Sequence, residues 1–381
     1  MVVVMHPNAS KEDIEKVAAR IEEGGCEVDL GKGINLKVLS IIGSEEKVDF
    51  ELLGNMSGVD YAQPIQRDIK YSLVSRRIGG NNVLPDRIIG IGNESIGKSL
   101  IGGNRPFYFV GPCAVENEDQ MRQVAEMACR LRADDNYGQY GIRGGCFKPR
   151  TAPHGWSGMG EKGLKILDDI RGEFELPIIT EVRRERHVDL VSKVADVLQI
   201  GARNCQNQDL LWKAGGSGMP VLYKRGKGMS IEEWFRGAQH IIKGGNGGID
   251  RSNRNIILCE RGEMGMSGDG EFLRYPSQMQ AGQVAKYETY LPVVFDPSHS
   301  AGDSRLVTGS SLGAIAMGYD ALLVEVHPNP KEARTDAKQQ LNIEEAESLI
   351  ESCNENHRLN HGPLKERREQ WFRDKGYRFV R

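Results

Sequence analysis

The stretch Gly141-Ile-Arg-Gly-Gly-Cys-Phe-Lys-Pro-Arg-Thr151 sets the frame in which the rest of this chain can be interpreted. A short apolar run from Tyr137 to Ile142 leads into it and predicts a β-strand. Arg143, Lys148 and Arg150 therefore fall at the end of a strand and in the loop beyond it. The glycine pair allows the backbone to approach a ligand closely. Taken alone, three cations fit a solvated basic loop as well as a phosphate site, so the surrounding pattern has to decide.

From Arg105 onward, short apolar strands alternate with helical stretches, which is typical of βα units and a parallel sheet. Eight strands are predicted: Phe107–Cys113, Tyr137–Arg143, Pro177–Val182, Val197–Ala202, Pro220–Lys224, Asn255–Cys259, Pro292–Asp296 and Ala321–Val326. Eight unbroken units favour a closed (β/α)8 TIM barrel over an open doubly wound sheet. No G-x-G-x-x-G follows the first strand, which argues against a dinucleotide site. The predicted fold class is α/β, with the barrel over residues 105–350.

Three further regions flank the barrel. Residues 1–70 predict a small separate α+β domain with strands at Val2–Met5 and Leu36–Ile42 and a helix over Glu12–Glu23 that begins at a Ser10-x-x-Asp13 capping box. Residues 71–104 predict a connector with a hairpin. Residues 351–381 predict a polar C-terminal tail whose aromatic cluster docks on the barrel domain or on a neighbouring subunit. That cluster consists of Trp371, Phe372, Tyr377 and Phe379.

The composition excludes several classes of protein. The 381 residues carry a net charge of -3 with 27% charged residues and no basic excess, so we expect no nucleic-acid or membrane-surface binding. No apolar run approaches the roughly 18 residues of a membrane span, and Met1–Met5 lacks the features of a signal peptide. We therefore expect a cytoplasmic protein. The seven cysteines are scattered without a C-x-x-C pair, which argues against a disulfide framework or a zinc knuckle.

Candidate metal ligands follow three of the predicted strands. Cys113, His299 and Glu325 come from strands one, seven and eight, which become neighbours when the barrel closes, and Asp336 lies in the loop after strand eight. One thiolate, one imidazole and two carboxylates suit a divalent ion such as Mn²⁺, Fe²⁺, Co²⁺ or Zn²⁺. An inert core thiol is the alternative for Cys113, and His327 stays unassigned.

Cations gather at the ends of strands two to six. They are Arg143, Lys148, Arg150, Arg203, Lys224 and Arg261. For any one of them an ordinary loop charge is an equal alternative, but their convergence on one barrel mouth predicts a pocket for a strongly anionic substrate or for two phosphorylated ones.

The motifs at these strand ends carry a resemblance. They are Gly111-Pro-Cys-Ala-Val-Glu116, Arg143-Gly-Gly-Cys-Phe-Lys-Pro-Arg-Thr151, Gln199-Ile-Gly-Ala-Arg-Asn204, Leu222-Tyr-Lys-Arg-Gly226, Ile257-Leu-Cys-Glu-Arg-Gly262, Asp296-Pro-Ser-His-Ser-Ala-Gly302 and Val324-Glu-Val-His-Pro328. In this order they resemble the 3-deoxy-D-arabino-heptulosonate 7-phosphate (DAHP) synthases of the type I beta class, which carry an N-terminal ferredoxin-like regulatory domain. The resemblance covers Met1 to Ile350, strongly over the barrel and loosely over the first domain.

The resemblance implies condensation of phosphoenolpyruvate with erythrose 4-phosphate, the first step of the shikimate pathway. It implies the metal ligands Cys113, His299, Glu325 and Asp336, and catalytic roles for Lys148, His299 and Cys113. It assigns Arg143, Lys148, Arg203, Lys224 and Arg261 to phosphoenolpyruvate, and Arg150 and Thr151 to the aldose phosphate. It also implies an aromatic amino acid as effector at the N-terminal domain and a homo-oligomer, which we expect to be a tetramer.

Departures from the family pattern leave acceptor choice open. The family's Thr-Ser becomes Thr151-Ala152, Gly244–Asn253 looks inserted, and Glu263–Arg274 replaces the usual Thr-Arg-Asn-Thr stretch. One alternative is a sister synthase that uses another aldose phosphate such as arabinose 5-phosphate, although the Lys-Pro-Arg-Thr motif argues against it. The other is a catalytically silent barrel that senses phosphometabolites.

Overall fold

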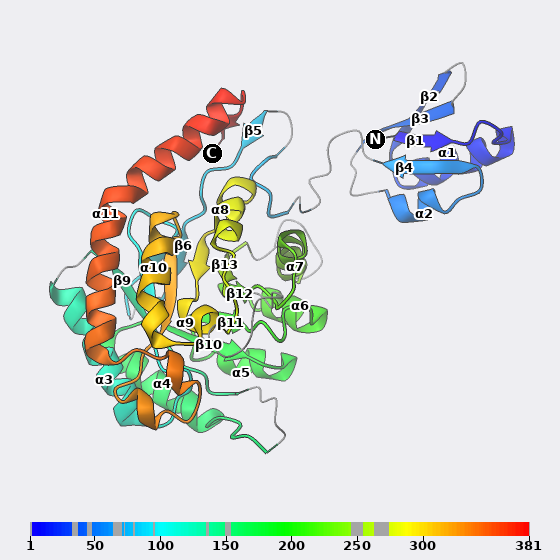
Figure 1. Cartoon of the computed structure of the whole chain (residues 1–381). Helices are drawn as coiled ribbons and strands as arrows, with labels where there is room; N and C mark the ends of the chain where they lie inside the picture. Colours follow the sequence, from blue (N-terminus) through cyan, green and yellow to red (C-terminus); the bar gives the residue numbers. More distant parts are fainter. Residues whose placement is uncertain are drawn as a thin grey trace. The chain divides into compact units, whose positions relative to one another are not determined.

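The computed structural model describes residues 2–32, 37–43, 48–63, 71, 73–78, 81–93, 96–134, 137–148, 154–244, 254–262 and 274–380. The chain divides into two compact units, Met1–Lys70 and Tyr71–Arg381 (Figure 1). The first unit ends at the residue where the sequence placed the end of the small domain.

The first unit is a four-stranded antiparallel sheet with two helices. Its elements are β1 (Val2–Met5), α1 (Lys11–Glu23), β2 (Glu27–Lys32), β3 (Lys37–Ile42), α2 (Phe50–Gly54) and β4 (Val59–Gln63). The β-α-β-β-α-β order with sheet order β2-β3-β1-β4 is the ferredoxin-like arrangement. Helix α1 begins at Ser10, whose Oγ accepts from the Asp13 amide at 3.0 Å while Asp13 Oδ2 accepts from the Ser10 amide at 3.1 Å. The predicted capping box is therefore present, with Asp in the place of Glu.

The second unit is built around a closed barrel of parallel strands, as predicted. The strands are β8 (Phe107–Gly111), β9 (Gln139–Arg143), β10 (Ile178–Val182), β11 (Val197–Ile200), β12 (Val221–Lys224), β13 (Ile256–Glu260), β14 (Val293–Phe295) and β15 (Ala321–Glu325). The barrel order is β10-β11-β12-β13-β14-β15-β8-β9, and pairing of Ala321 with Phe107 joins the last strand to the first. All eight strands overlap the predicted ones, and strands one, seven and eight are neighbours.

Helices surround the barrel. They are α3 (Glu118–Asp134), α4 (Glu161–Phe174), α5 (Val188–Val191), α6 (Gln208–Gly216), α7 (Ile231–Lys243), α8 (Met279–Glu288), α9 (Pro297–Ala301), α10 (Val307–Ala316) and α11 (Ile343–Asp374), with 3-10 turns at Glu185–His187, Ser304–Leu306, Pro330–Glu332 and Ala337–Gln339. Helix α7 shows why these segments are helical: Ser230 and Glu233 form a capping box, and one face buries Trp234, Ala238 and Ile241.

A hairpin seals the end of the barrel at which the strands begin. The predicted hairpin is confirmed as β6 (Ile89–Ile91) paired antiparallel with β7 (Ser99–Ile101). Its isoleucines belong to one buried cluster with the first inward-facing residues of the strands, such as Phe107 and Phe109. The opposite end, where the strands finish, is left for a site.

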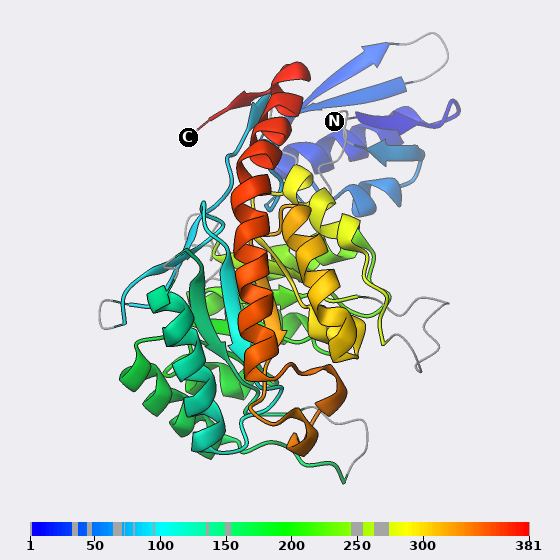
Figure 2. The ribbon, with the colours of Figure 1, turned by 60° about the vertical axis from the view of Figure 1, so that its left-hand side comes forward.

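Helix α11 runs through the boundary that the sequence predicted between the barrel and the C-terminal tail. It crosses residue 350 without a break, so the division into a barrel to 350 and a tail from 351 does not coincide with the end of any element. It runs along the outside of the barrel beside α3 and α10 (Figures 1 and 2). After it, β16 (Arg378–Phe379) pairs with β5 (Asn82–Val83). The Phe372 ring is fully buried against Tyr287 of α8, so the aromatic cluster docks on its own unit.

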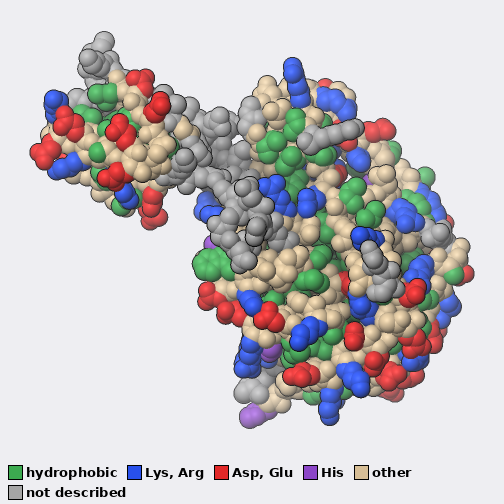
Figure 3. Space-filling model, turned by 180° about the vertical axis from the view of Figure 1, so that it is seen from behind, with side chains coloured by type: hydrophobic (Ala, Val, Ile, Leu, Met, Phe, Trp, Pro, Cys, Tyr) green, Lys and Arg blue, Asp and Glu red, His purple; other side chains and the backbone are tan. Residues whose placement is uncertain are grey.

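The surface carries charges of both signs. On the face of the second unit seen in Figure 3, Lys and Arg side chains lie among Asp and Glu side chains. In the part of the chain that the structure describes, none of the helices combines the length and apolar character needed to cross a bilayer.

Candidate active site and metal centre

A cavity of about 200 Å³ opens where the barrel strands end. It is lined by Lys148, Glu181, Gly201, Ala202, Arg203, Lys224, Lys227, Arg261, Arg274, Tyr275, His299 and Asp336. Six of these twelve side chains are Lys or Arg, so the cavity is strongly cationic. Such a cavity favours an anionic ligand.

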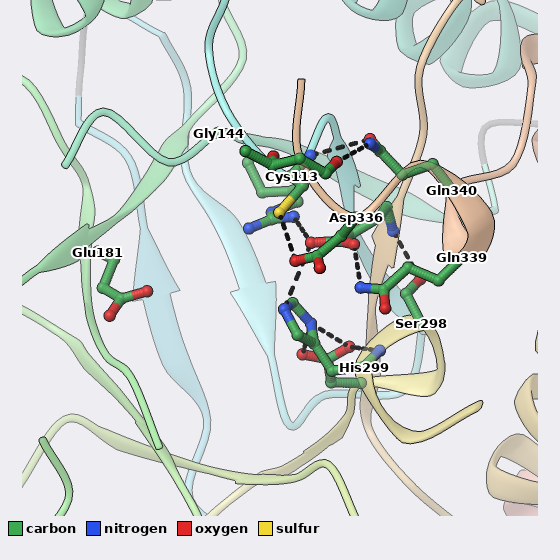
Figure 4. A network of polar contacts seen from close by, with 12 residues as sticks. Cys113, Gly144, Glu181, Ser298, His299, Asp336, Gln339 and Gln340 are labelled. Atoms are coloured by element: carbon green, nitrogen blue, oxygen red, sulfur yellow. Dashed lines mark hydrogen bonds and ion pairs between the residues drawn. The ribbon is translucent and has the colours of Figure 1, made fainter. Parts of the chain in front are cut away.

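The four predicted metal ligands lie together at one side of the mouth (Figure 4). Cys113 follows β8, His299 lies in α9, Glu325 ends β15, and Asp336 precedes the turn Ala337–Gln339. One donor atom from each lies within 4.8 Å of the others. Residues separated by more than 200 positions in the sequence thus share one centre because β14, β15 and β8 are adjacent.

Helix α9 orients His299. Asp296 caps this helix, accepting from the His299 amide at 3.0 Å, and its other oxygen lies 2.9 Å from His299 Nδ1. His299 Nε2 therefore faces the cluster, 3.5 Å from Glu325 Oε1. Burial lowers the pKa of His299 and outweighs the opposing effect of Asp296 and Glu325. A neutral ring held in this tautomer offers its Nε2 lone pair to a metal.

Both carboxylate oxygens of Glu325 have a donor. Arg143 Nη1 donates to Oε1 at 2.6 Å, and Gln339 Nε2 donates to Oε2. Burial alone would raise the pKa of Glu325, but His299 and Arg143 outweigh it and the pKa is lowered. The side chain is fully buried and charged, and its orientation is fixed from two sides.

Cys113 and Asp336 contact each other directly. Cys113 Sγ donates to Asp336 Oδ2 at 3.2 Å, and Lys148 Nζ lies 3.0 Å from the same sulfur. Burial, aided by Glu325, raises the pKa of Cys113 to about 12, so the thiol is protonated until a cation favours the thiolate. Asp336 has the left-handed φ of 52°, which Asp tolerates better than most residues and which is enriched at functional sites.

This donor set fits a divalent transition metal. A thiol, an imidazole and two carboxylates converge in one buried cluster, which matches the ligand preferences of borderline ions. Lys148, Arg143 and Arg274 lie close enough to offset the negative charge of the ligands, since each contacts one of them.

The predicted substrate cations fall into two groups. Lys224 pairs with Asp296 at 2.5 Å, and Arg143 pairs with Glu325. Among the described residues, by contrast, no carboxylate lies within salt-bridge distance of Arg203 or Arg261. Arg261 is buried and Arg203 is exposed. An unmatched buried cation is unfavourable, so Arg261 in particular favours an anion in this part of the cavity.

Arg150 and Thr151 lie outside the described residues, as do 245–253 and 263–273 of the segments that depart from the family pattern. His327, left unassigned from the sequence, accepts at Nδ1 from the Asn329 amide at 3.0 Å and so supports its own loop.

The sequence reasoning missed four residues of the cavity. Glu181 is the residue before the end of β10, the one strand for which no polar end residue had been predicted, and it faces the cavity apart from the ligand cluster (Figure 4). Its place at a strand end was the available signal. Lys227 follows Lys224 by one short turn. Arg274 and Tyr275 follow no predicted strand, so the sequence pattern did not indicate them. Backbone hydrogen bonds to Ala301 and Ser300 hold them at the mouth.

Comparison with known proteins bears on both units. Residues 87–360 match the DAHP synthetase I family, and residues 1–67 match the DAHP synthase ferredoxin-like domain. A phospho-2-dehydro-3-deoxyheptonate aldolase from Thermotoga maritima is 35% identical over 92% of this chain and 96% of its own length. A crystal structure of the aldolase of that name from the same organism superposes with a TM-score of 0.74 at 34% identity, covering 92% of this chain and 95% of the other.

More distant relatives cover less of this chain. A 2-dehydro-3-deoxyphosphooctonate aldolase from Fusobacterium nucleatum is 31% identical over 68% of this chain and 94% of its own length. The Thermotoga maritima relative therefore extends over more of this chain than the octonate aldolase does. The chain belongs to the DAHP synthetase I family, and its first unit is a ferredoxin-like domain of the kind found in DAHP synthases.

Proposed function

We propose that this chain condenses phosphoenolpyruvate with erythrose 4-phosphate to give 3-deoxy-D-arabino-heptulosonate 7-phosphate and phosphate, the first step of the shikimate pathway. The observation that carries the proposal is the cavity itself. It lies beside a cluster of four side chains that could hold a metal, and it is lined by Arg203 and Arg261, which have no acid partner among the described residues. The family to which the barrel belongs performs this reaction.

The metal would be held by Cys113, His299, Glu325 and Asp336. A bound Mn²⁺, Fe²⁺, Co²⁺ or Zn²⁺ ion would supply a Lewis acid that polarises the aldehyde of erythrose 4-phosphate. Asp296 keeps the His299 ring in the orientation that this requires, and Arg143 and Gln339 do the same for Glu325.

The cations bind and orient phosphoenolpyruvate. Among the described residues, no acid lies within salt-bridge distance of Arg203 or Arg261, and Lys224, which pairs with Asp296, lines the same cavity. Carbon three of phosphoenolpyruvate bonds to the aldehyde carbon, water adds at carbon two, and the carbon–oxygen bond to phosphate then breaks. Lys148, whose Nζ lies beside Cys113 Sγ, is placed to act between the metal centre and the anion site. Arg150 and Thr151 are proposed to bind the aldose phosphate on the strength of their motif.

The first unit is proposed to be regulatory. It has its own core and, in its described residues, no cluster of metal ligands, so its role is separate from the chemistry. We propose tyrosine or phenylalanine as its effector and a tetramer as the working assembly. Deleting residues 1–70 should leave an active barrel that these amino acids no longer inhibit. An intact enzyme indifferent to both would refute this role.

A product assay tests the main proposal. Phosphoenolpyruvate is offered with a panel of aldose phosphates, with and without a chelator, and the products are identified by mass spectrometry. The expected result is a seven-carbon product from erythrose 4-phosphate that is lost on chelation and restored by a divalent metal. An eight-carbon product from arabinose 5-phosphate alone would identify a sister synthase, and no product from any acceptor would identify a sensor.

A further inference from the structure

We propose that Tyr275 is a positioning residue of the anion site, which holds Arg261 and Lys227 in place for the phosphate of phosphoenolpyruvate. This inference rests on the proposed function and adds a residue to it. Tyr275 belongs to no predicted strand end, and its neighbour Arg274 closes the segment that departs from the family pattern.

The contacts of Arg261 differ from those of three other cations at the mouth. Arg143, Lys224 and Arg274 each pair with a carboxylate. Arg261 is 4% exposed, and its guanidinium carbon lies 4.6 Å from the centroid of the Tyr275 ring. An aromatic face attracts a cation through its quadrupole. It can therefore hold a guanidinium without neutralising it, whereas a carboxylate would compete with an incoming phosphate.

The same ring contacts a second cation. Lys227 Nζ donates to the Tyr275 hydroxyl and lies 4.3 Å from the ring centroid. Burial raises the pKa of Tyr275, but the hydrogen bond from Lys227 and the charges of Lys227, Arg261 and Arg274 outweigh it and leave the pKa lowered. One phenol side chain therefore contacts three cations that line the cavity, Arg261, Lys227 and, at 5.7 Å from the ring centroid, Arg274.

Tyr275 is itself held by the backbone around it. Its amide donates to the Ser300 carbonyl at 3.0 Å, and its carbonyl accepts from Ser300 Oγ at 3.0 Å. Gly262 has a φ of 84°, and a Cβ there would lie 2.2 Å from the Tyr275 carbonyl oxygen. The backbone of Tyr275 is thus held against α9, which carries His299, and lies close to Gly262, the residue after Arg261. Its position is set by the frame of the site.

The test separates the ring from the hydroxyl. Tyr275→Leu removes both, and it should raise the KM for phosphoenolpyruvate about 3- to 30-fold, the range expected for loss of a buried cation–π contact. The kcat and the KM for erythrose 4-phosphate should stay within about 3-fold of wild type, because no atom of the ring is assigned to the reacting groups. Tyr137→Leu is the matched control, since the Tyr137 ring also carries a cation, Arg358 at 4.3 Å, but does not line the cavity.

Calorimetric titration with inorganic phosphate gives a readout that does not depend on turnover. Weaker phosphate binding by Tyr275→Leu in an enzyme that makes no heptulosonate would sink the proposed function and keep the positioning role. Unchanged phosphate affinity and unchanged KM would overturn the inference, and so would equal increases in both KM values, which mark a general structural defect. If the leucine variant does not fold, two other variants test the inference. Lys227→Met is expected to raise the KM for phosphoenolpyruvate about 3- to 30-fold, and Tyr275→Phe is expected to raise the same KM by less than about 3-fold. Wild-type values for Lys227→Met, or a larger effect of Tyr275→Phe, would then overturn it.

Discussion

Two clusters of charge lie at opposite ends of the same barrel. They differ because the mouth also holds cations without an acid partner, beside Arg143 and Lys224, which have one. At the end where the strands begin, Asp86 pairs with Arg76 and Arg368, and Lys286 pairs with Asp320 at 2.8 Å. At the mouth, Arg203 and Arg261 have no acid partner among the described residues. Hydrogen-bonded pairs satisfy buried charges, whereas an unmatched cation costs stability unless a ligand completes it.

We therefore expect the paired cations to stabilise the fold and the unpaired cations to bind a ligand. Arg76, Asp86 and Arg368 join the connector to the C-terminal helix, segments almost 300 residues apart in sequence.

Cys113→Ser should produce the largest change, at the mouth. A hydroxyl is a poor ligand for borderline ions, so bound metal and turnover should fall by more than about 100-fold while the melting temperature changes little. Metal content is measured by elemental analysis beside the condensation assay. Cys129→Ser is the control, because Cys129 is half-buried on α3 and away from the ligand set. Full activity and full metal content in Cys113→Ser would refute the assigned centre.

Asp86→Asn should affect stability instead. It leaves Arg76, Arg368 and Lys286, whose Nζ lies 3.7 Å from Asp86, with a weaker acceptor. Breaking a buried pair in this way costs about 3–5 kcal/mol of unfolding free energy. The exposed pair Lys213–Asp189 provides the control, since Asp189→Asn should cost no more than about 1 kcal/mol. Urea denaturation measures both variants. Equal midpoints for Asp86→Asn and wild type would show that the paired cluster does not support the fold.

The sequence predicted the barrel and the clustering of Cys113, His299, Glu325 and Asp336 because both leave local signals. Apolar runs bounded by turns mark the strands, and Cys113, His299 and Glu325 follow three of them directly. The C-terminal helix left no such signal. Beyond residue 350 its buried face includes Asn354, His357 and Arg368, whose polarity hides the helical period that apolar residues would show.

The cavity residues that were missed depend on tertiary contacts. Arg274 and Tyr275 reach the mouth through hydrogen bonds to α9, and no periodic pattern in the chain encodes those bonds. The distinction between paired and unpaired cations is equally invisible in sequence, because Asp296 and Glu325 are distant from the cations that they neutralise.

His357→Gln should have the smallest effect and should again spare the mouth. Burial, aided by the stacked His361 ring, lowers the pKa of His357 to about 3, and its Nδ1 lies 2.8 Å from the Tyr137 hydroxyl. The unfolded chain, with a histidine pKa of about 6.5, binds more protons between these two values. Stability should therefore fall as the pH drops through that window.

Glutamine at position 357 should make this fall less steep. Melting temperatures recorded from pH 7 to pH 4 measure the slope, and His154→Gln, at an exposed position, is the control. If wild type and His357→Gln lose stability in parallel, the buried histidine is not the source of the acid sensitivity.

The most direct measurement compares Arg261→Met with Asp86→Asn in one experiment, using the condensation assay at a temperature where both are folded, together with their melting temperatures. We predict that Arg261→Met lowers kcat/KM for phosphoenolpyruvate roughly 30-fold or more, as loss of about 2 kcal/mol or more from a buried charged contact requires, with a melting temperature equal to or above that of wild type. Asp86→Asn should show the reverse, with a lower melting temperature and kcat/KM within about twofold of wild type. A fall in melting temperature for Arg261→Met without a change in kcat/KM would contradict the claim that unpaired cations at the mouth are there for the substrate.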